Sequence, residues 1–231
     1  MNQAYIYESS KNSDFSGPEA LIILPDIYCQ TDYSKKTTEE FSVVFKKPAF
    51  LLDYFYIYTQ EENRFSENDQ GKVHDLMQNF KGEDFVVFFK KTLAEIKQSY
   101  PNITSFSVIG FCFGGRLSYM AGAEDNVFKI FSFYGPGANT PNYVGGQSPL
   151  EYLTLKKGGS NLQVVSFFGL NDPTIPEEDR MKIREIMKDA GIDYVPHEYE
   201  AGHAYFQEGR KNYNERASLA SWNVLKSIFG N

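Results

Sequence analysis

Hydrophobic and polar positions along this chain fall into short apolar runs that alternate with stretches of helical spacing. A continuous apolar run is typical of a strand that is buried on both faces of a sheet. Turn residues close these runs, for example the Pro25-Asp26 pair and the segment 135–137, Gly-Pro-Gly. Six strands are therefore predicted, at residues 20–26, 48–58, 105–111, 126–135, 162–169 and 193–201.

Helices are predicted between and after these runs, at residues 83–97, 114–122, 176–191 and 212–229. In 83–97 the apolar residues recur every three or four positions, and 176–191 starts with Pro and stops at Gly, as helices prefer. Strands that alternate with helices predict an α/β fold, with a mostly parallel sheet covered by helices on both faces. No repeat or linker divides the chain, so we expect one domain over residues 1–231.

The carboxyl ends of the predicted strands carry the residues that can do chemistry. In parallel sheets, ligands bind beyond these ends, and here they carry Asp26, Cys112, Asp172 and His203. The segment 137–161, rich in Gly, Pro, Asn and Ser, predicts a loop near the mouth of such a site. Whether this loop acts as a lid stays open.

Cys112 lies in the sequence Gly-Phe-Cys-Phe-Gly, between a predicted strand and a predicted helix. This is the nucleophile-elbow pattern with Cys in place of Ser. The turn is so tight that side chains at Gly110 and Gly114 would collide with the neighbouring strand and helix. It also places the sulfur near a helix N-terminus, whose partial positive charge favours a thiolate. Cys112 is therefore the predicted nucleophile.

A nucleophilic thiol needs a base and a group that orients the base. Of the three histidines, His203 follows a strand end, whereas His74 lies in a polar stretch and His197 lies inside a predicted strand. Asp172 directly follows the strand 162–169, where it either caps a turn before Pro173 or fixes the histidine tautomer. The chain order Cys, Asp, His is that of the α/β-hydrolase triad. On the same fold, the N–H groups of Phe113 and Ile27 are the predicted oxyanion hole.

Several motifs together resemble one family, the dienelactone hydrolases of the α/β-hydrolase superfamily. These are GFCFGGR, FYGPG, G-x-N-D-P-x-I-P, AGHAYF and a final N-Y-N-x-x-A-x-x-A-x-W, over about residues 18 to 229. The resemblance implies an enzyme without cofactor or metal that hydrolyses an ester or lactone through an acyl-cysteine. In that scheme Cys112 is the nucleophile, His203 the base and Asp172 the orienting acid.

The sequence departs from this family at two places. Family members place a glutamate, which gates the thiol, where this chain has Asp26, so Asp26 either gates Cys112 or caps a loop. Family enzymes that act on dienelactone also hold its carboxylate with arginines, one of them four residues after the histidine, where this chain has Gln207. Arg210 or Arg64 could substitute. The reaction class therefore carries over to this chain, whereas the named substrate does not.

The predicted surroundings of the site are apolar and aromatic. An apolar acyl or aryl ester is therefore as plausible a substrate as an anionic lactone. Cys29 is interpreted as a packed or surface residue without a catalytic role. Besides Arg210, the residues predicted to bind substrate or to surround it are Phe111, Phe113, Tyr134, Tyr205 and Phe206.

Composition narrows the partners and the compartment. A net charge of −7 and a pI near 5.1 argue against binding to nucleic acid or to an anionic membrane. The first residues show no signal-peptide pattern, no run is long enough to span a membrane, and two cysteines make no disulfide framework. We expect a cytoplasmic protein, a monomer or weak homodimer, with a small-molecule substrate.

Two functions remain compatible with these patterns. The first is a hydrolase of carboxylic esters or lactones. The second is a non-hydrolytic binding or redox-responsive protein on the same scaffold, because an accessible thiolate is also easily oxidised. The order of Cys112, Asp172 and His203 favours the hydrolase, since a binding protein has no need of these residues at three strand ends.

Overall fold

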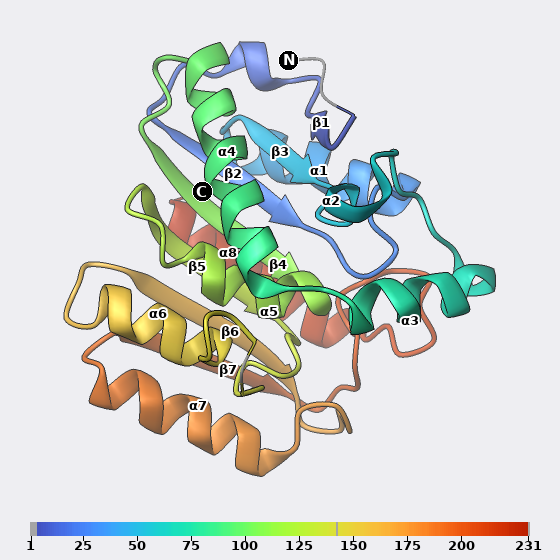
Figure 1. Cartoon of the computed structure of the whole chain (residues 1–231), viewed down its shortest axis with the longest axis vertical. Coiled ribbons are helices and arrows are strands. Elements are labelled where there is room, and N and C mark those ends of the chain that lie inside the picture. The colour runs from blue at the N-terminus through green and yellow to red at the C-terminus, as the bar shows by residue number, and fades with distance from the viewer. Residues whose placement is uncertain (1–3, 142, 231) are drawn as a thin grey trace.

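The computed structural model describes residues 4–141 and 143–230, and its seven strands form one sheet (Figure 1). Their order across the sheet is β1-β3-β2-β4-β5-β6-β7, and β1 is antiparallel to β3 while every other neighbouring pair is parallel. The strands are β1 (Ile6–Glu8), β2 (Glu19–Leu24), β3 (Ala49–Leu52), β4 (Ser105–Phe111), β5 (Val127–Phe133), β6 (Gln163–Gly169) and β7 (Asp193–Tyr199). This is the predicted mostly parallel α/β sheet, and one domain over residues 1–231 stays a prediction.

Helices cover both faces of the sheet. The α-helices are α1 (Asp32–Phe45), α2 (Tyr56–Thr59), α3 (Gln70–Gln78), α4 (Gly82–Ser99), α5 (Phe113–Ala121), α6 (Pro149–Lys157), α7 (Glu177–Asp189) and α8 (Glu215–Phe229). In Figure 1, α4, α5 and α6 lie in front of the strands, whereas α1 and α8 pack on each other behind them. Two short 3-10 helices cover residues 12–14 and 67–69.

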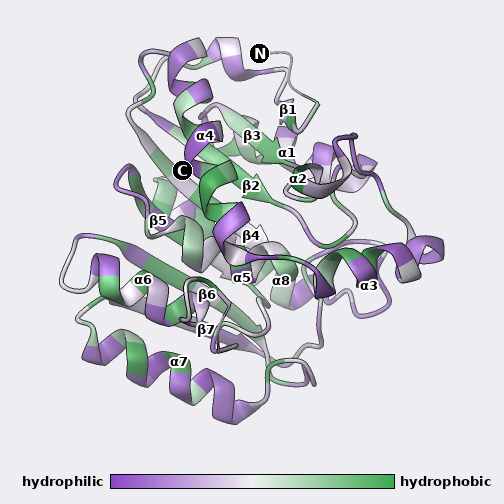
Figure 2. Ribbon diagram, in the orientation of Figure 1, coloured by the Kyte–Doolittle hydropathy of each residue, from purple (hydrophilic) through white to green (hydrophobic). Residues whose placement is uncertain are grey.

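The apolar interior lies between the sheet and these helix layers. Figure 2 shows hydrophobic strands in the middle of the molecule and hydrophilic outer faces on the helices. Strand β2 illustrates the cause, since its residues 20–24 are buried at successive positions on both faces. Such double burial requires a continuous apolar run rather than an alternating one.

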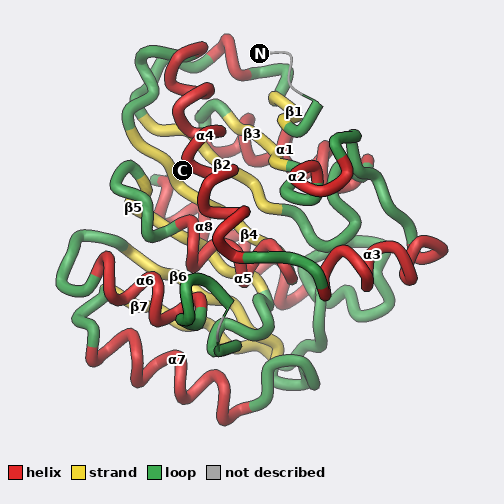
Figure 3. The backbone as a smooth tube through the Cα atoms, in the orientation of Figure 1, coloured by secondary structure: helices red, strands yellow, loops and turns green. Residues whose placement is uncertain are grey.

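The register of the sheet brings the strand ends together at one edge. Leu24 pairs with Gly110, Phe111 with Phe133, and Gly169 with Tyr199. The loops that follow β2, β4, β5, β6 and β7 therefore leave the sheet on the same side (Figure 3). Every strand-end residue singled out in the sequence lies in or beside one of these loops.

The predicted strand 48–58 is wrong in its second half. Strand β3 ends at Leu52, and residues 56–59 form helix α2. The buried Asp53 carboxylate accepts hydrogen bonds from the backbone N–H groups of Phe55 and Tyr56, which turns the chain out of the sheet. The aromatic residues that suggested a strand lie in this turn instead, and they pack into the interior from there.

The prediction of a loop over the whole of 137–161 is also wrong, because α6 lies within it. Ser148 and Glu151 form a capping box in which each side chain bonds the backbone N–H of the other, and Pro149 follows at the first helical position. Helix α6 packs against α5 and α7 as part of the helix layer. Residue 142 of this predicted loop lies outside the described residues.

Helix α1 and strand β1 are absent from the sequence prediction. The buried face of α1 is partly polar, with Thr37, Thr38 and Ser42 beside Phe41 and Phe45. Thr38 and Ser42 each donate a hydroxyl hydrogen bond to a backbone carbonyl oxygen, which allows them to be buried. A hydrophobic pattern cannot reveal a helix whose buried face is built in this way.

Candidate active site

The turn from β4 to α5 puts Cys112 in a backbone conformation that L residues rarely adopt, with φ of 52° and ψ of −117°. The flanking residues Gly110 and Gly114 must be glycine because neither position has room for a side chain. A Cβ atom on Gly110 would lie 2.1 Å from the carbonyl oxygen of Gly114, and one on Gly114 would lie 2.2 Å from that of Leu24. The chain can therefore make this turn only with glycine at both positions, and the turn leaves the half-buried Cys112 side chain at the sheet edge.

Cys112, His203 and Asp172 form a continuous hydrogen-bonded chain. The His203 Nε2 atom lies 3.1 Å from Cys112 Sγ, and the His203 Nδ1 atom lies 2.7 Å from Asp172 Oδ2. The Asp172 side chain is fully buried, whereas 22% of the His203 side chain is exposed. The structure thus brings together three residues that are far apart in the sequence, with the acid inside and the imidazole open to a small molecule.

Hydrogen bonding in this chain favours the charged forms of the acid and the imidazole. Burial alone would lower the pKa of His203, but its hydrogen bonds to Asp172 and Cys112 outweigh burial and raise the pKa to about 10. Burial likewise favours a protonated Asp172, yet hydrogen bonds from His203 and Thr174 lower its pKa. The positive charge on His203 therefore lies next to the buried Asp172 carboxylate, which it stabilises.

Thr174 is part of the site although the sequence analysis did not single it out. Its backbone N–H and its hydroxyl both donate to Asp172 Oδ1, at 2.9 and 2.7 Å. The same hydroxyl lies 3.1 Å from His203 Nδ1. The predicted turn-capping role of Asp172 therefore coexists with its contact to His203, because the two carboxylate oxygens are used separately. The sequence Asn-Asp-Pro-Thr contained the signal, since a hydroxyl two residues after an Asp is well placed to donate to it.

A narrow apolar cavity lies beside Cys112, His203 and Asp172, which we call the candidate triad. The empty space in this cavity and at its open mouth is about 320 Å³. We call this cavity the inner cavity. Tyr134 connects it to the candidate triad, because its ring packs edge-on against the His203 imidazole with centroids 5.2 Å apart. Burial, followed by the neighbouring groups Tyr33, Tyr205, Asp26 and Cys112, raises the pKa of Tyr134. The inner cavity is lined by Ile23, Pro25, Asp26, Tyr33, Ser34, Thr37, Phe111, Tyr134 and Gln207.

Asp26 and Arg210 form an ion pair at the rim of this cavity. Arg210 Nη2 lies 3.0 Å from Asp26 Oδ2, and its guanidinium stacks on the Tyr28 ring at 4.3 Å. Asp26 Oδ1 also accepts the Tyr28 backbone N–H at 2.9 Å, which is the loop-capping role predicted as one alternative. Burial raises the pKa of Asp26, although Arg210 opposes this. Within the described residues no contact joins Asp26 to the sulfur, and thiol gating stays a prediction.

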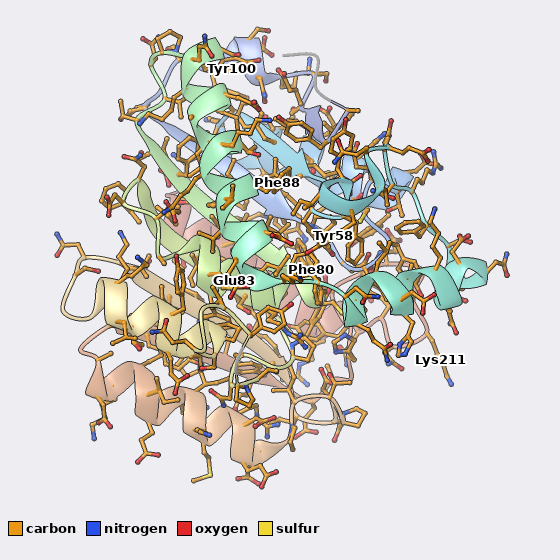
Figure 4. All side chains as sticks on the ribbon, in the orientation of Figure 1. Tyr58, Phe80, Glu83, Phe88, Tyr100 and Lys211 are labelled. Carbon is orange, nitrogen blue, oxygen red and sulfur yellow. The ribbon has the colours of Figure 1, made fainter. Side chains whose placement is uncertain are left out.

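Phe113 and Ile27, the predicted oxyanion-hole residues, lie on adjacent segments. Phe113 is the first residue of α5, and Ile27 is half-buried in the loop after β2. The Tyr54 hydroxyl fixes that loop by donating to the Asp26 carbonyl oxygen at 2.7 Å, and the Tyr54 ring packs on Phe113. The Phe113 side chain therefore points into the interior, where Phe80 joins it with centroids 5.0 Å apart. Figure 4 shows Phe80 beside Tyr58 near the start of α4.

Two of the aromatic residues predicted to bind substrate do not line the inner cavity but pack on residues that do. Tyr205 is fully buried, and its hydroxyl lies 3.0 Å from Ser221 Oγ. Phe206 is 3% exposed and packs on Phe111 and Trp222. Their role in binding stays a prediction, and their contacts support the wall that carries Tyr134 and Phe111.

The remaining candidates lie away from the candidate triad. His74 contacts Gln78 on the surface of α3, and His197 stacks on Phe167 in the sheet. Arg64 pairs with Asp32 at the surface. Cys29 is buried, forms no disulfide and makes a β-bridge to Arg64. In the described part of the chain, no group of three or more His, Cys, Asp or Glu side chains is arranged to hold a metal ion, and no helix is long and apolar enough to cross a membrane.

A mostly parallel sheet covered on both faces, with a tight strand-to-helix turn at Cys112 after β4 and an acid and a histidine after β6 and β7, defines an α/β-hydrolase fold. The model of the dienelactone hydrolase family matches residues 17–231. The chain belongs to the dienelactone hydrolase family.

Curated relatives agree with this assignment. A Synechocystis protein named "Putative carboxymethylenebutenolidase" is 31% identical over 137 residues, which are 57% of this chain and 53% of that protein. The carboxymethylenebutenolidase of a Pseudomonas species is 27% identical over 157 residues, 67% of this chain and 60% of the relative. The chain thus spans little more than half the length of these relatives.

Solved structures share the fold. The crystal structure titled "Putative Dienelactone Hydrolase" from Klebsiella pneumoniae has a TM-score of 0.81 and 17% identity, and the match covers 98% of this chain and 92% of that one. Esterase 2 of Thermogutta terrifontis, solved with propionate bound, has a TM-score of 0.63 and 17% identity, with 98% and 89% covered. At this level of identity the likeness concerns the fold alone.

Proposed function

We propose that this protein hydrolyses carboxylic esters or lactones through an acyl-cysteine intermediate. The observation that carries the proposal is the hydrogen-bonded chain from Cys112 Sγ through His203 to Asp172. Family membership supports hydrolysis as the class of reaction. An imidazole held in one tautomer by a buried carboxylate, with its other nitrogen against a thiol, is the arrangement that nucleophilic acyl transfer needs.

In the proposed first half-reaction, Cys112 Sγ attacks the carbonyl carbon and its proton resides on His203 Nε2. The tetrahedral intermediate collapses when the C–O bond to the leaving group breaks, and His203 gives that oxygen the proton. In the second half-reaction His203 takes a proton from water, whose oxygen attacks the thioester. The C–S bond then breaks, the acid product leaves, and the thiolate is restored.

We also propose that the N–H groups of Phe113 and Ile27 stabilise the oxyanion. Their segments lie against each other, because a Cβ on Gly114 would meet the carbonyl oxygens of Leu24 and Pro25 at 2.2 and 2.3 Å. The Phe113 N–H is at the N-terminus of α5, where backbone donors are free and the helix dipole favours a negative charge.

The ion pairs at the rim of the site favour neutral substrates with apolar acyl groups. The Arg210 guanidinium already has two acidic partners, Asp26 at 3.0 Å and Glu67 at 3.4 Å. A substrate carboxylate would have to compete with these partners for Arg210. We therefore propose that neutral esters and lactones are hydrolysed more efficiently than anionic lactones of the same size.

The test is a panel of aryl esters and of neutral and anionic lactones, measured on the wild type, Cys112→Ala and Cys112→Ser. We expect Cys112→Ala to lower kcat/KM by about 10³-fold or more, because the nucleophile is lost. Cys112→Ser should keep a slower, altered activity. Cys29→Ala is the matched control, since it removes the other thiol and should leave kcat/KM unchanged.

Unchanged hydrolysis by Cys112→Ala would overturn the acyl-cysteine mechanism. Oxidation of Cys112 by mild peroxide, with no turnover of any ester or lactone by the wild type, would favour the binding or redox-responsive protein instead. A marked preference for anionic lactones would contradict the proposed neutral substrate and would give Arg210 a direct role in binding.

A further inference from the structure

Three hollows of the molecule meet at Tyr33, near the start of α1. The first is the inner cavity. The second, which we call the α1–α8 hollow, lies between α1 and α8 and is lined by Tyr33, Lys36, Thr37, Glu40, Phe206, Glu208, Tyr213, Ser218 and Trp222. The third is an open groove over Tyr28 and Arg210. Tyr33 is the residue that lines all three.

The Tyr33 side chain spans a gap between two segments of the chain. It begins on α1, and its hydroxyl reaches the Phe206 carbonyl oxygen at 3.5 Å, in the loop that follows His203. Thr37, one turn further along α1, also borders both the inner cavity and the α1–α8 hollow. The two spaces are therefore neighbours that share Tyr33 and Thr37 as lining residues.

We propose that Tyr33 is the partition that limits the length of the acyl group this protein accepts, and that the α1–α8 hollow is a closed-off extension of the acyl pocket. This inference rests on the proposed hydrolase function. With Tyr33 in place, the inner cavity takes short acyl groups. Without the ring, a longer hydrocarbon chain can pass into the hollow.

The direction of the acyl group follows from the positions of the reacting groups and from the lining of the inner cavity. His203 Nε2 faces the sulfur and delivers its proton to the leaving oxygen, so the leaving group lies on the imidazole side. We place the acyl group in the inner cavity, because its lining is mostly apolar and includes Phe111, the residue before Cys112.

The α1–α8 hollow has the chemistry to take a hydrocarbon chain. Its inner wall includes the Phe206 ring and the Trp222 ring, whose centroids are 5.8 Å apart, and its volume is about 410 Å³ with its open side included. Lys36, Glu40 and Glu208 supply charged groups to the same hollow. These charged side chains are exposed, so a hydrocarbon chain in the hollow would pack against the Phe206 and Trp222 rings instead.

The contacts of Tyr33 allow its removal to be tested. Tyr33 is half-buried, and its hydrogen bond to Phe206 is at the limit of hydrogen-bond length. The N-cap of α1 is Thr31, whose side chain accepts the Ser34 N–H, so the start of the helix does not depend on the tyrosine ring. A smaller residue at this position therefore opens the partition while α1 stays capped.

The experiment measures kcat/KM for 4-nitrophenyl acetate, butyrate, hexanoate and octanoate, on the wild type, Tyr33→Ala, Tyr33→Val and Tyr33→Phe. We expect the ratio of octanoate to acetate to rise about tenfold or more in Tyr33→Ala, and less in Tyr33→Val, because a pocket gains specificity with each methylene it accommodates. Tyr33→Phe keeps the ring and should keep the wild-type ratio. Tyr213→Ala shortens a side chain that lines the same hollow but leaves Tyr33 in place, so it should also keep the wild-type ratio.

Acetate turnover close to wild type shows that a variant is folded and that its catalytic groups are in place. An unchanged octanoate-to-acetate ratio in such Tyr33→Ala and Tyr33→Val variants would overturn the partition. So would a gain that appears only when the alcohol, rather than the acyl group, is lengthened. If instead Cys112→Ala still hydrolyses the acetate, the failure lies with the proposed function and not with Tyr33.

Discussion

At the scale of single residues, unusual backbone conformations gather around the candidate site. Lys46 and Gln60 have positive φ because they end helices, where a left-handed residue is common. The other non-glycine residues with positive φ in the described chain are at or near the strand ends that form the site: Cys29, Cys112, Tyr134 and Ala204. Such conformations cost free energy and persist only where the surrounding structure fixes them, which is typical of functional sites.

Thr174 is expected to act as a positioning residue through Asp172. Its hydroxyl holds Asp172 Oδ1, which leaves Oδ2 aligned with the imidazole of His203. Thr174→Val keeps the shape of the side chain but removes this donor, so we expect kcat/KM to fall about tenfold, through kcat rather than KM. Thr174→Ser restores the hydroxyl and should restore most of the activity.

The pH profile separates this role from a merely structural one. The lost hydrogen bond stabilises the Asp172 carboxylate, whose pKa lies below its usual value, so in Thr174→Val this pKa should move upward. The acidic limb of the kcat/KM profile should then shift to higher pH. Equal rates and an unshifted profile in Thr174→Val would exclude the positioning role.

At the scale of elements, one arginine joins helix α7, strand β7 and the loop that carries Asp172. Arg180 Nε donates to Glu198 Oε1 at 3.0 Å, and Arg180 Nη1 donates to the Ile175 carbonyl oxygen at 2.8 Å. Arg180 is 6% exposed. Glu198 also contacts Arg184, so loss of Arg180 costs mainly the buried hydrogen bond to the Ile175 carbonyl oxygen and the packing of the arginine side chain.

Arg180→Ala should therefore lower the free energy of unfolding by about 1 to 3 kcal/mol and reduce kcat/KM, since the Ile175 carbonyl oxygen at the end of the loop from Asp172 loses its donor. Arg184→Ala is the matched control. Arg184 contacts the same Glu198 oxygen at 3.0 Å, but its side chain is 43% exposed. Urea unfolding and ester assays of both variants provide the measurement, and equal losses in both would contradict a special role for Arg180.

At the scale of the whole molecule, an ion-pair cluster links three strands of the sheet and the segment just before β3 at the end opposite to the site. Glu19 begins β2, and its carboxylate contacts Lys47 at 2.9 Å, Lys129 at 3.2 Å and the Ser107 hydroxyl. Burial favours the protonated acid, but the bonds from Lys47 and Ser107 and the charge of Lys129 outweigh it and lower the pKa of Glu19.

A lowered pKa means that ionised Glu19 stabilises the fold. This contribution to the free energy of unfolding is present above pH 4.5, the ordinary pKa of glutamate, and is lost as the pH falls below that value. At pH 7 we expect Glu19→Gln to lower the free energy of unfolding by about 1 to 2 kcal/mol. At pH 3.5 the difference from wild type should shrink.

Urea unfolding at the two pH values measures this difference. Glu40→Gln is the control, because Glu40 pairs with Lys36 across 3.7 Å at the surface and should change stability little at either pH. A loss in Glu19→Gln that is as large at pH 3.5 as at pH 7 would show that packing, and not charge, explains the effect.

Local patterns along the chain determined the class of fold and the position of the site. Double-sided burial leaves continuous apolar runs, as in β2 and β4, and these predicted the strands of the sheet. The sharp turn at Cys112 left its signature in Gly110 and Gly114, since both glycines are needed for lack of space. The sequence also placed Asp172 and His203 at strand ends, because strand ends are marked by local turn residues.

Contacts between distant segments decided the rest. The end of β3 depends on the hydrogen bonds of Asp53, and the buried polar face of α1 depends on carbonyl partners. The ion pair of Asp26 with Arg210 and the partition at Tyr33 each join residues more than 170 positions apart. A sequence displays periodicity and turn chemistry within a few residues, whereas the partner of a buried polar group is chosen only when the chain has folded and brings the two together.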